Sequence, residues 1–210
     1  MNNKKHILSG LYLVLDPAMN EEMLFKRLEL VLAKEVAAIQ IWDHFRTNQD
    51  EEALIQQICD LSAPYDVPVL INNKWQHLKH TSLAGVHFDS IPKNIKEMKA
   101  EINRDIMIGL TCGNDLKMVR WAAEYELDYI SFCSMFPSVS VSSCEIVTFE
   151  TVKKARAIFK NSLFLAGGIY PGNLACLREL QYDGIAVVSG VMGSENPVSS
   201  IHQYYREFKK

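Results

Sequence analysis

Residues Leu163 to Gly193, LFLAGGIYPGNLACLRELQYDGIAVVSGVMG, contain two short apolar runs that each end in a turn of small residues. The runs are Leu163–Ala166 and Gly184–Val188, and the turns are Gly167-Gly168 and Ser189-Gly190. Short apolar runs separated by a helical segment are typical of strands in a parallel sheet. In a parallel β/α barrel, the loops after the last two strands commonly bind phosphate. Because glycines expose backbone N–H groups, the stretch predicts a site for a phosphorylated small molecule.

The rest of the chain repeats an apolar run followed by an amphipathic segment. The runs expected to be strands are Leu11–Leu15, Ala37–Ile41, Val67–Ile71, Gly85–Phe88, Ile106–Leu110, Asp128–Cys133, Leu163–Ala166 and Gly184–Val188. Strict alternation with helical segments predicts parallel pairing and covering layers of helices. An open, doubly wound sheet would show the same alternation. The number of runs, together with the glycine turns after the last two, favours a closed (β/α)8 TIM barrel.

Residue types that begin helices mark several of the connecting segments. We expect Asn20, Asn114 and Thr148 to cap helices, because their side chains can accept hydrogen bonds from the N–H groups of a first turn. A short helical segment is expected over Trp75–His80, and a longer helix over Pro197–Phe208 closes the chain. The connections between the strands are therefore predicted to be helical.

The overall composition is that of an ordinary globular protein. Length and the absence of a linker, repeat or low-complexity segment predict a single domain over residues 1–210. A net charge of -3 supplies no basic field for nucleic acid or an anionic membrane. The apolar runs are too short for a membrane span or a signal peptide, so we expect a cytoplasmic protein. The five cysteines are odd in number and scattered, and they support neither a disulfide framework nor a zinc site.

Polar side chains that follow the predicted strands are the candidates for an active site. In a parallel β/α barrel the loops at the C-terminal ends of the strands build that site. The residues in these positions are Gln40, Trp42, Asp43, His44, Asn72, Asn73, Lys74, His87, Asp89, Thr111, Cys112, Ser134, Ser138 and Ser140. A buried amide such as that of Gln40 at the end of an apolar strand needs a hydrogen-bond partner, which favours a binding role.

These segments resemble the thiamine phosphate synthase/thiazole tautomerase superfamily over nearly the whole chain. GLYLVLD at residues 10–16 resembles that family's LYLVTD, and VLINN at residues 69–73 resembles LIIND. DYISFCSMFPSVSV at residues 128–141 is similar to DYIGFGPIFPTKTK. LAGGIYPGN at residues 165–173 and GIAVVSGVMGSENP at residues 184–197 are similar to IGGITPEN and GVAVVSAIMGAEDP.

The resemblance implies a barrel enzyme of thiamine biosynthesis. Such a transferase joins a pyrimidine methyl pyrophosphate to a thiazole phosphate and releases pyrophosphate with the help of Mg²⁺. It implies substrate-binding roles for Gln40, Asn72, Thr111, Gly167, Gly168, Ser189 and Gly190. It implies catalytic roles for Ser138 and Ser140, which replace two loop threonines, and for His44, which takes the place of a lysine.

Several positions depart from the family pattern. Trp42-Asp43-His44 stands where the family has Arg-Glu-Lys, and Val141 stands where it has a lysine. Asn73 replaces a magnesium-binding aspartate, and an amide is a poorer ligand than a carboxylate for a hard cation. Asn73 and Asp89 are nevertheless the candidate ligands for the expected Mg²⁺. The half of the site that handles thiazole phosphate is thus better preserved than the half that handles pyrophosphate and metal.

These observations leave three functions open. The first is a divergent thiamine phosphate synthase. The second is a tautomerase or isomerase of a thiazole phosphate, although that branch uses a histidine where this chain has Ser134. The third is a non-catalytic protein that binds thiazole phosphate or thiamine phosphate. All three predict a phosphorylated small-molecule partner, and a homo-oligomer stays open.

Overall fold

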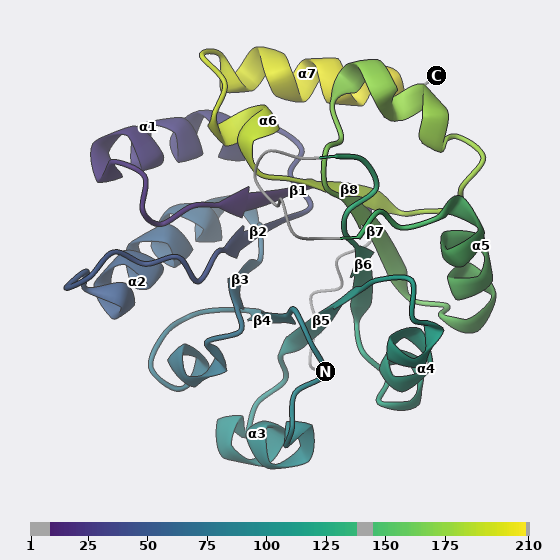
Figure 1. Cartoon of the computed structure of the whole chain (residues 1–210). Coiled ribbons are helices and arrows are strands. Elements are labelled where there is room, and N and C mark those ends of the chain that lie inside the picture. The colour runs from purple at the N-terminus through teal and green to yellow at the C-terminus, as the bar shows by residue number, and fades with distance from the viewer. Residues whose placement is uncertain (1–8, 138–144, 209–210) are drawn as a thin grey trace.

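The computed structural model describes residues 9–137 and 145–208. Its parallel strands close into a barrel in chain order, and β1 pairs with β8 to complete the ring (Figure 1). The strands are β1 (Gly10–Leu15), β2 (Ala38–Ile41), β3 (Val69–Asn72), β4 (Gly85–Phe88), β5 (Met107–Cys112), β6 (Tyr129–Phe132), β7 (Ser162–Ala166) and β8 (Gly184–Val187). The predicted (β/α)8 fold is confirmed. β3 begins later than expected, after Pro68, because proline has no N–H to donate to a neighbouring strand.

Helices surround the strands on the outside of the barrel (Figure 1). The α-helices are α1 (Glu21–Leu32), α2 (Glu51–Ser62), α3 (Ile95–Ile102), α4 (Leu116–Glu124), α5 (Phe149–Ile158), α6 (Ser189–Met192) and α7 (Pro197–Phe208). The 3-10 segments are η1 (Ala63–Tyr65), η2 (Trp75–Lys79) and η3 (Pro171–Leu177). The connections after β3 and β7 are therefore single 3-10 segments rather than full helices. Within the described residues, no helix is long and apolar enough to cross a membrane.

The helix starts were predicted correctly at two positions and wrongly at one. The side chains of Asn20 and Thr148 accept hydrogen bonds from the first turns of α1 and α5. At α4 the cap is Asp115 and not its neighbour Asn114. The Asn114 side chain instead donates to the Ile146 carbonyl and accepts from the Thr148 N–H. The Asn114 side chain therefore connects the loops that precede α4 and α5, and it does not cap α4.

The apolar core has two layers, because successive strand residues point to opposite faces of the sheet. The outer layer lies between the strands and the helices and contains most of the buried leucines, isoleucines and valines. The inner layer fills the barrel with Tyr12, Ala38, Leu70, Met107, Tyr129 and Phe164. The rings of Tyr12, Tyr129 and Phe164 pack with centroids 5.4 to 5.8 Å apart. Two of these interior rings carry a hydroxyl group, so the centre of the barrel is not purely apolar.

Candidate active site

A cavity of about 610 Å³ opens at the C-terminal ends of the strands. Every residue to which the sequence assigned substrate binding lines this cavity: Gln40, Asn72, Thr111, Gly167, Gly168, Ser189 and Gly190. Asp89 also lines it, whereas Asn73 and His44 are not among its lining residues. Ser138 and Ser140 lie outside the described residues. Its volume falls within the usual range of about 300–1,000 Å³ for small-molecule sites.

One end of the cavity is formed by the backbone that follows β7 and β8. Gly167 and Gly168 have φ values of +84° and +65°, a conformation that side chains with a Cβ rarely adopt. A Cβ on Gly167 would come within 2.0 Å of Ser134 Oγ, and one on Gly168 within 2.5 Å of the Pro137 carbonyl. Ser189 and Gly190 begin α6, so their N–H groups have no partner within that helix. This end can therefore offer backbone N–H groups to an anion.

Two surrounding helices hold this backbone in place. From α7, the buried hydroxyl of Tyr204 donates to the Ile169 carbonyl at 3.0 Å. A Cβ on Gly190 would come within 2.2 Å of the same hydroxyl oxygen, so glycine permits the close approach of α6 to α7. From α1, the guanidinium of Arg27 donates to the Met192 carbonyl at the end of α6. The two loops are thus positioned by residues that are distant in sequence.

The polar wall of the cavity centres on a buried histidine, His87 of β4. His87 Nε2 lies 2.8 Å from Thr111 Oγ1, and Nδ1 lies 2.9 Å from the Tyr129 hydroxyl. Thr111 Oγ1 is also 3.3 Å from Ser131 Oγ, and the Asn72 amide donates to the His87 carbonyl. Burial lowers the pKa of His87 to about 4, although the nearby charge of Asp89 acts in the opposite direction. His87 is therefore neutral near pH 7.

In the loop after β2, the residue that lines the cavity is Trp42 and not His44, to which the sequence analysis assigned a catalytic role. Trp42 lines the cavity, and the exposed ring of His44 stacks on it with centroids 3.8 Å apart and an interplanar angle of 23°. The structure thus brings Trp42, rather than His44, to the ligand space. Trp42 and His87 were among the candidates at the strand ends but were given no substrate-binding or catalytic role. Ser131 was missed because it lies within the predicted strand Asp128–Cys133.

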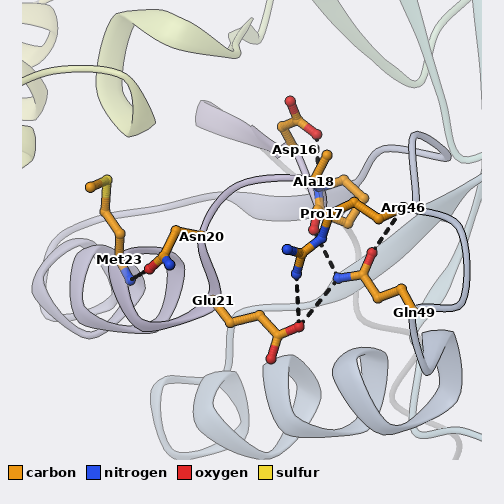
Figure 2. A network of polar contacts seen from close by, with 8 residues as sticks. All are labelled: Asp16, Pro17, Ala18, Asn20, Glu21, Met23, Arg46 and Gln49. Atoms are coloured by element: carbon orange, nitrogen blue, oxygen red, sulfur yellow. Dashed lines mark hydrogen bonds and ion pairs between the residues drawn. The ribbon is translucent and has the colours of Figure 1, made fainter.

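Arg46, the arginine of the loop between β2 and α2, forms an ion pair outside the cavity lining. Its Nη2 lies 3.1 Å from Glu21 Oε1, and Figure 2 shows this pair beside Gln49. Gln49 Nε2 donates to the Pro17 carbonyl at 3.0 Å, and its Oε1 accepts from the Arg46 N–H. These contacts join the loops that follow β1 and β2, so Arg46 serves their packing. It does not line the cavity.

Lys74, the lysine after β3, also forms an ion pair and does not line the cavity. Its Nζ lies 2.5 Å from Glu51 Oε1 and 4.6 Å from the centroid of the Phe45 ring. His77 Nε2 lies 2.8 Å from the other oxygen of Glu51. Burial raises the pKa of the Glu51 carboxyl, but the hydrogen bonds from Lys74 and His77 outweigh it and lower that pKa. Within the described part of the chain, no lysine or arginine lines the cavity.

The candidate magnesium ligands form a hydrogen-bonded cluster instead of an open cation site. Asn73 Nδ2 donates to Asp43 Oδ2 at 2.9 Å and to Asp89 Oδ2 at 2.8 Å. Asn73 Oδ1 accepts from the Asp89 backbone N–H at 3.1 Å, which fixes the orientation of the amide. Its NH₂ group therefore faces both carboxylates. Mg²⁺ requires oxygen ligands in nearly ideal octahedral geometry, and a nitrogen donor between two carboxylates does not fit it. Among the residues described, no three His, Cys, Asp or Glu side chains gather as a metal site.

Comparison with known proteins assigns the family. The chain matches the family described as "Thiamine monophosphate synthase" over residues 11–191, and it belongs to that family. The thiamine-phosphate synthase of Azoarcus sp. (strain BH72) is 28% identical over 199 residues, covering 93% of this chain and 95% of the relative. That of Methanobrevibacter smithii is 25% identical over 200 residues, covering 95% of each chain.

Solved structures show the same fold. A thiamine phosphate pyrophosphorylase from Pyrococcus furiosus superimposes with a TM-score of 0.82 at 22% identity, covering 99% of this chain and 98% of its own. An orotidine 5'-monophosphate decarboxylase from Methanocaldococcus jannaschii, complexed with an inhibitor, superimposes with a TM-score of 0.71 at 16% identity. It covers 97% of this chain and 100% of its own. At these identities the likeness concerns the barrel itself.

Proposed function

We propose that this protein acts in thiamine biosynthesis as a thiamine phosphate synthase-like transferase. It would join a pyrimidine methyl pyrophosphate to a thiazole phosphate with release of pyrophosphate. The observation that carries this proposal is that all of the expected substrate-binding residues line a single cavity, in a chain whose family match spans residues 11–191. From the family, we also propose phosphorylated small molecules as its partners and the cytoplasm as its location.

The thiazole phosphate belongs at the backbone-lined end of the cavity. We assign its phosphate oxygens to the N–H groups of Gly168, Ser189 and Gly190, all of which line the cavity. The pyrimidine would lie toward β2 and β3, against Gln40 and Asn72, with the ring of Trp42 available for stacking. This arrangement brings the thiazole nitrogen toward the methylene carbon of the pyrimidine, so positioning contributes to the rate.

The departure of pyrophosphate is the step that the described cavity supports least. Negative charge grows on that group as the bond to the methylene carbon breaks, and enzymes stabilise such charge with fixed donors and cations. Here the available donors are the hydroxyl group of Ser131 and the amide of Gln40. Because the Asp43–Asn73–Asp89 cluster does not fit magnesium, we route no step through a metal.

The same observation favours a second function, a non-catalytic protein that binds thiazole phosphate or thiamine phosphate. Such a protein needs the backbone-lined end and has no use for cations at the other end. Nothing comparable favours a tautomerase. Ser134 is buried, its hydroxyl donates to the Phe136 carbonyl at 2.7 Å, and it does not line the cavity.

Two measurements on the full chain separate the two functions. Calorimetric titration with thiazole phosphate tests the shared binding step, and an assay with both substrates, with and without Mg²⁺, tests the transfer. Turnover above the uncatalysed rate supports the synthase and excludes the non-catalytic protein. Binding without turnover supports the non-catalytic protein, and the absence of binding contradicts both.

Fluorescence locates the ligand within the cavity. A substrate that stacks on Trp42 should change the tryptophan emission, and Trp42→Phe should abolish that change. Trp121 stacks on Tyr125 and does not line the cavity, so its emission should not respond to ligand. A response that survives Trp42→Phe would place the ligand elsewhere.

A further inference from the structure

A continuous chain of hydrogen bonds crosses the interior of the barrel and joins two parts of the cavity wall. It runs from β2 through β1, β6 and β4 to β5, and then returns to β6. Its members in order are Gln40, Tyr12, Tyr129, His87, Thr111 and Ser131. The contacts from Gln40 to Thr111 measure 2.8, 2.8, 2.9 and 2.8 Å, and the last, from Thr111 to Ser131, measures 3.3 Å.

The two tyrosines connect the ends without reaching the ligand space. Gln40, His87, Thr111 and Ser131 line the cavity, whereas Tyr12 and Tyr129 are almost completely buried and do not. Tyr129 lies across Gly109 of β5, where a Cβ would come within 2.0 Å of its ring. The packing thus fixes both phenol groups at the centre of the barrel.

The chain has a defined direction that follows from counting protons. The Tyr12 hydroxyl donates to Gln40 Oε1, so the Tyr12 oxygen must accept from the Tyr129 hydroxyl. The Tyr129 oxygen then accepts from Nδ1–H of His87. A neutral imidazole carries one proton, so Nε2 must accept from the hydroxyl of Thr111.

This direction requires uncharged side chains, and burial keeps them uncharged. Burial raises the pKa of Tyr12, although the hydrogen bond to Tyr129 lowers it, and burial together with the neighbouring Tyr12 raises that of Tyr129. The buried imidazole of His87 has both ring nitrogens against neutral hydroxyl groups, so a charged form would lack an anion in hydrogen-bond contact. Both phenols therefore keep their protons near pH 7, and the imidazole carries only one. Each hydrogen bond in the chain holds one proton in one direction.

We infer that Tyr12 and Tyr129 are positioning residues that set the hydrogen-bonding character of the cavity wall. Because Gln40 Oε1 accepts inward, its Nε2 is left as a donor toward the cavity. Among the described residues, every fully buried side-chain nitrogen or oxygen has a hydrogen-bond partner. Gln40 forms its hydrogen bond through Oε1 and has none at Nε2 to any residue described, so Nε2 must be accessible to solvent or ligand. Thr111 donates inward to His87, so it presents an acceptor outward.

The pattern defines the class of ligand that fits this wall. A suitable ligand presents an acceptor to Gln40 on β2 and a donor to Thr111 on β5. This ligand class rests on the proposed function, whereas the direction of the chain is a property of the ligand-free protein. If the Gln40 amide were reversed, every bond in the chain would reverse and His87 would carry its proton on Nε2. The tautomer of His87 therefore reports whether Gln40 and Thr111 each present a hydrogen-bond donor or an acceptor to the cavity.

Nitrogen-15 NMR of the histidines in the full ligand-free chain, near pH 7, tests the inference. The wild type should show His87 protonated on Nδ1. Tyr12→Phe should shift the proton to Nε2, because the hydroxyl of Tyr129 loses its acceptor and can then donate to Nδ1. This effect is diagnostic, since Tyr12 makes no recorded hydrogen bond to His87. Gln40→Glu, whose carboxylate can only accept, should keep the proton on Nδ1.

A matched control removes a different buried phenol. Tyr204→Phe deletes a hydroxyl that donates to the Ile169 carbonyl, outside the chain, and should leave the His87 tautomer unchanged. An Nε2 proton in the wild type would overturn the inference, and this measurement requires no variant to fold. A Tyr12→Phe protein that keeps the Nδ1 tautomer would also overturn it.

Ligand binding gives a second readout. Tyr12→Phe should lower the affinity for the pyrimidine substrate about tenfold, which is the cost expected for mismatched hydrogen bonds. The affinity for thiazole phosphate should stay within about twofold of the wild type. Equal losses for both ligands would indicate a general structural effect and contradict the positioning role. Failure of the wild type to bind either ligand would refute the proposed function, while the tautomer measurement would still decide the inference.

Discussion

Asn73 and Asp89 hold each other by a reciprocal pair of hydrogen bonds. The Asn73 amide donates to the Asp89 carboxylate at 2.8 Å, and the Asp89 backbone N–H donates to Asn73 Oδ1 at 3.1 Å. The same amide donates to Asp43, so one neutral side chain satisfies two carboxylates. The two N–H groups of the Asn73 amide therefore occupy the position between the carboxylates where a cation would bind. This relationship leads to the first prediction.

Asn73→Asp should create affinity for Mg²⁺ or Mn²⁺ that the wild type lacks. The variant replaces the N–H donors with oxygen, the ligand these cations prefer, beside two existing carboxylates. At a metal concentration 100-fold above Kd, binding stabilises the fold by about 2.7 kcal/mol. That corresponds to a rise in Tm of about 5–10 °C in a chain of this size. Thermal unfolding with and without metal measures it.

Asn103→Asp is the matched control for this prediction. Asn73 and Asn103 both have positive φ, 55° and 48°, so both substitutions change the same group in the same backbone conformation. Asn103 caps the end of α3, away from the paired carboxylates. Magnesium should leave its Tm unchanged. A Tm shift in the wild type as large as that in Asn73→Asp would contradict the prediction.

His87 should make stability depend on pH below neutrality. Its pKa is about 4 in the folded protein and near the ordinary 6.5 when unfolded, so the unfolded state binds the proton more readily. The stabilisation is fully present above pH 6.5 and is lost progressively down to pH 4, for a total of about 3 kcal/mol. Urea unfolding of the wild type and His87→Gln across this range measures the difference. Equal slopes for the two proteins would show that His87 is not the group responsible.

Gly168→Ala should remove phosphate binding. The position has a φ of +65°, and the added methyl group would collide with the Pro137 and Phe136 carbonyls. We expect thiazole phosphate affinity to fall at least about tenfold and stability to fall by about 1–3 kcal/mol from backbone strain. Gly113→Ala is the control, because its Cβ would meet nothing within 4 Å. Calorimetry and urea unfolding of both variants measure the effects, and unchanged affinity in Gly168→Ala would exclude this backbone from the site.

Lys74→Met should leave ligand binding intact. Lys74 is paired with Glu51 and packs on Phe45, and it does not line the cavity. Thiazole phosphate and pyrophosphate affinities should stay within about twofold, and stability should fall by only about 0.5–1 kcal/mol, because the ion pair is partly exposed. Titration calorimetry measures both affinities. A tenfold loss of pyrophosphate affinity would show that Lys74 turns toward the ligand when it binds.

Much of the barrel could be predicted because its signals are local. Apolar runs and small-residue turns such as Gly167-Gly168 report strands and their ends through steric and hydrophobic effects that act over a few residues. The rule that barrels build their sites at the C-terminal strand ends then selected Gln40, Asn72 and Thr111, all of which line the cavity. The Asp115 cap was missed because Asn114, an equally good cap by residue type, is engaged by a distant loop.

The orientation of the polar side chains could not be predicted in this way. Nothing in the sequence says that Lys74 turns to Glu51, or that Asn73 turns its NH₂ group toward two carboxylates. Tyr12 and Tyr129 fall within predicted strands that are 117 positions apart in the sequence, and only the closed barrel brings their hydroxyl groups to 2.8 Å. A hydrogen bond depends on distance and angle, which residue order does not contain.

The sequence by itself therefore determined the alternation of strands and helices, the family, and the set of residues near the strand ends. Tertiary structure decided which of those residues face the ligand space, which cations are engaged elsewhere, and which tautomer His87 adopts. The physical reason is the range of the forces involved. Hydrophobic periodicity and backbone sterics act along a few neighbouring residues, whereas ion pairs and hydrogen-bond direction are set by groups that only the closed barrel brings together.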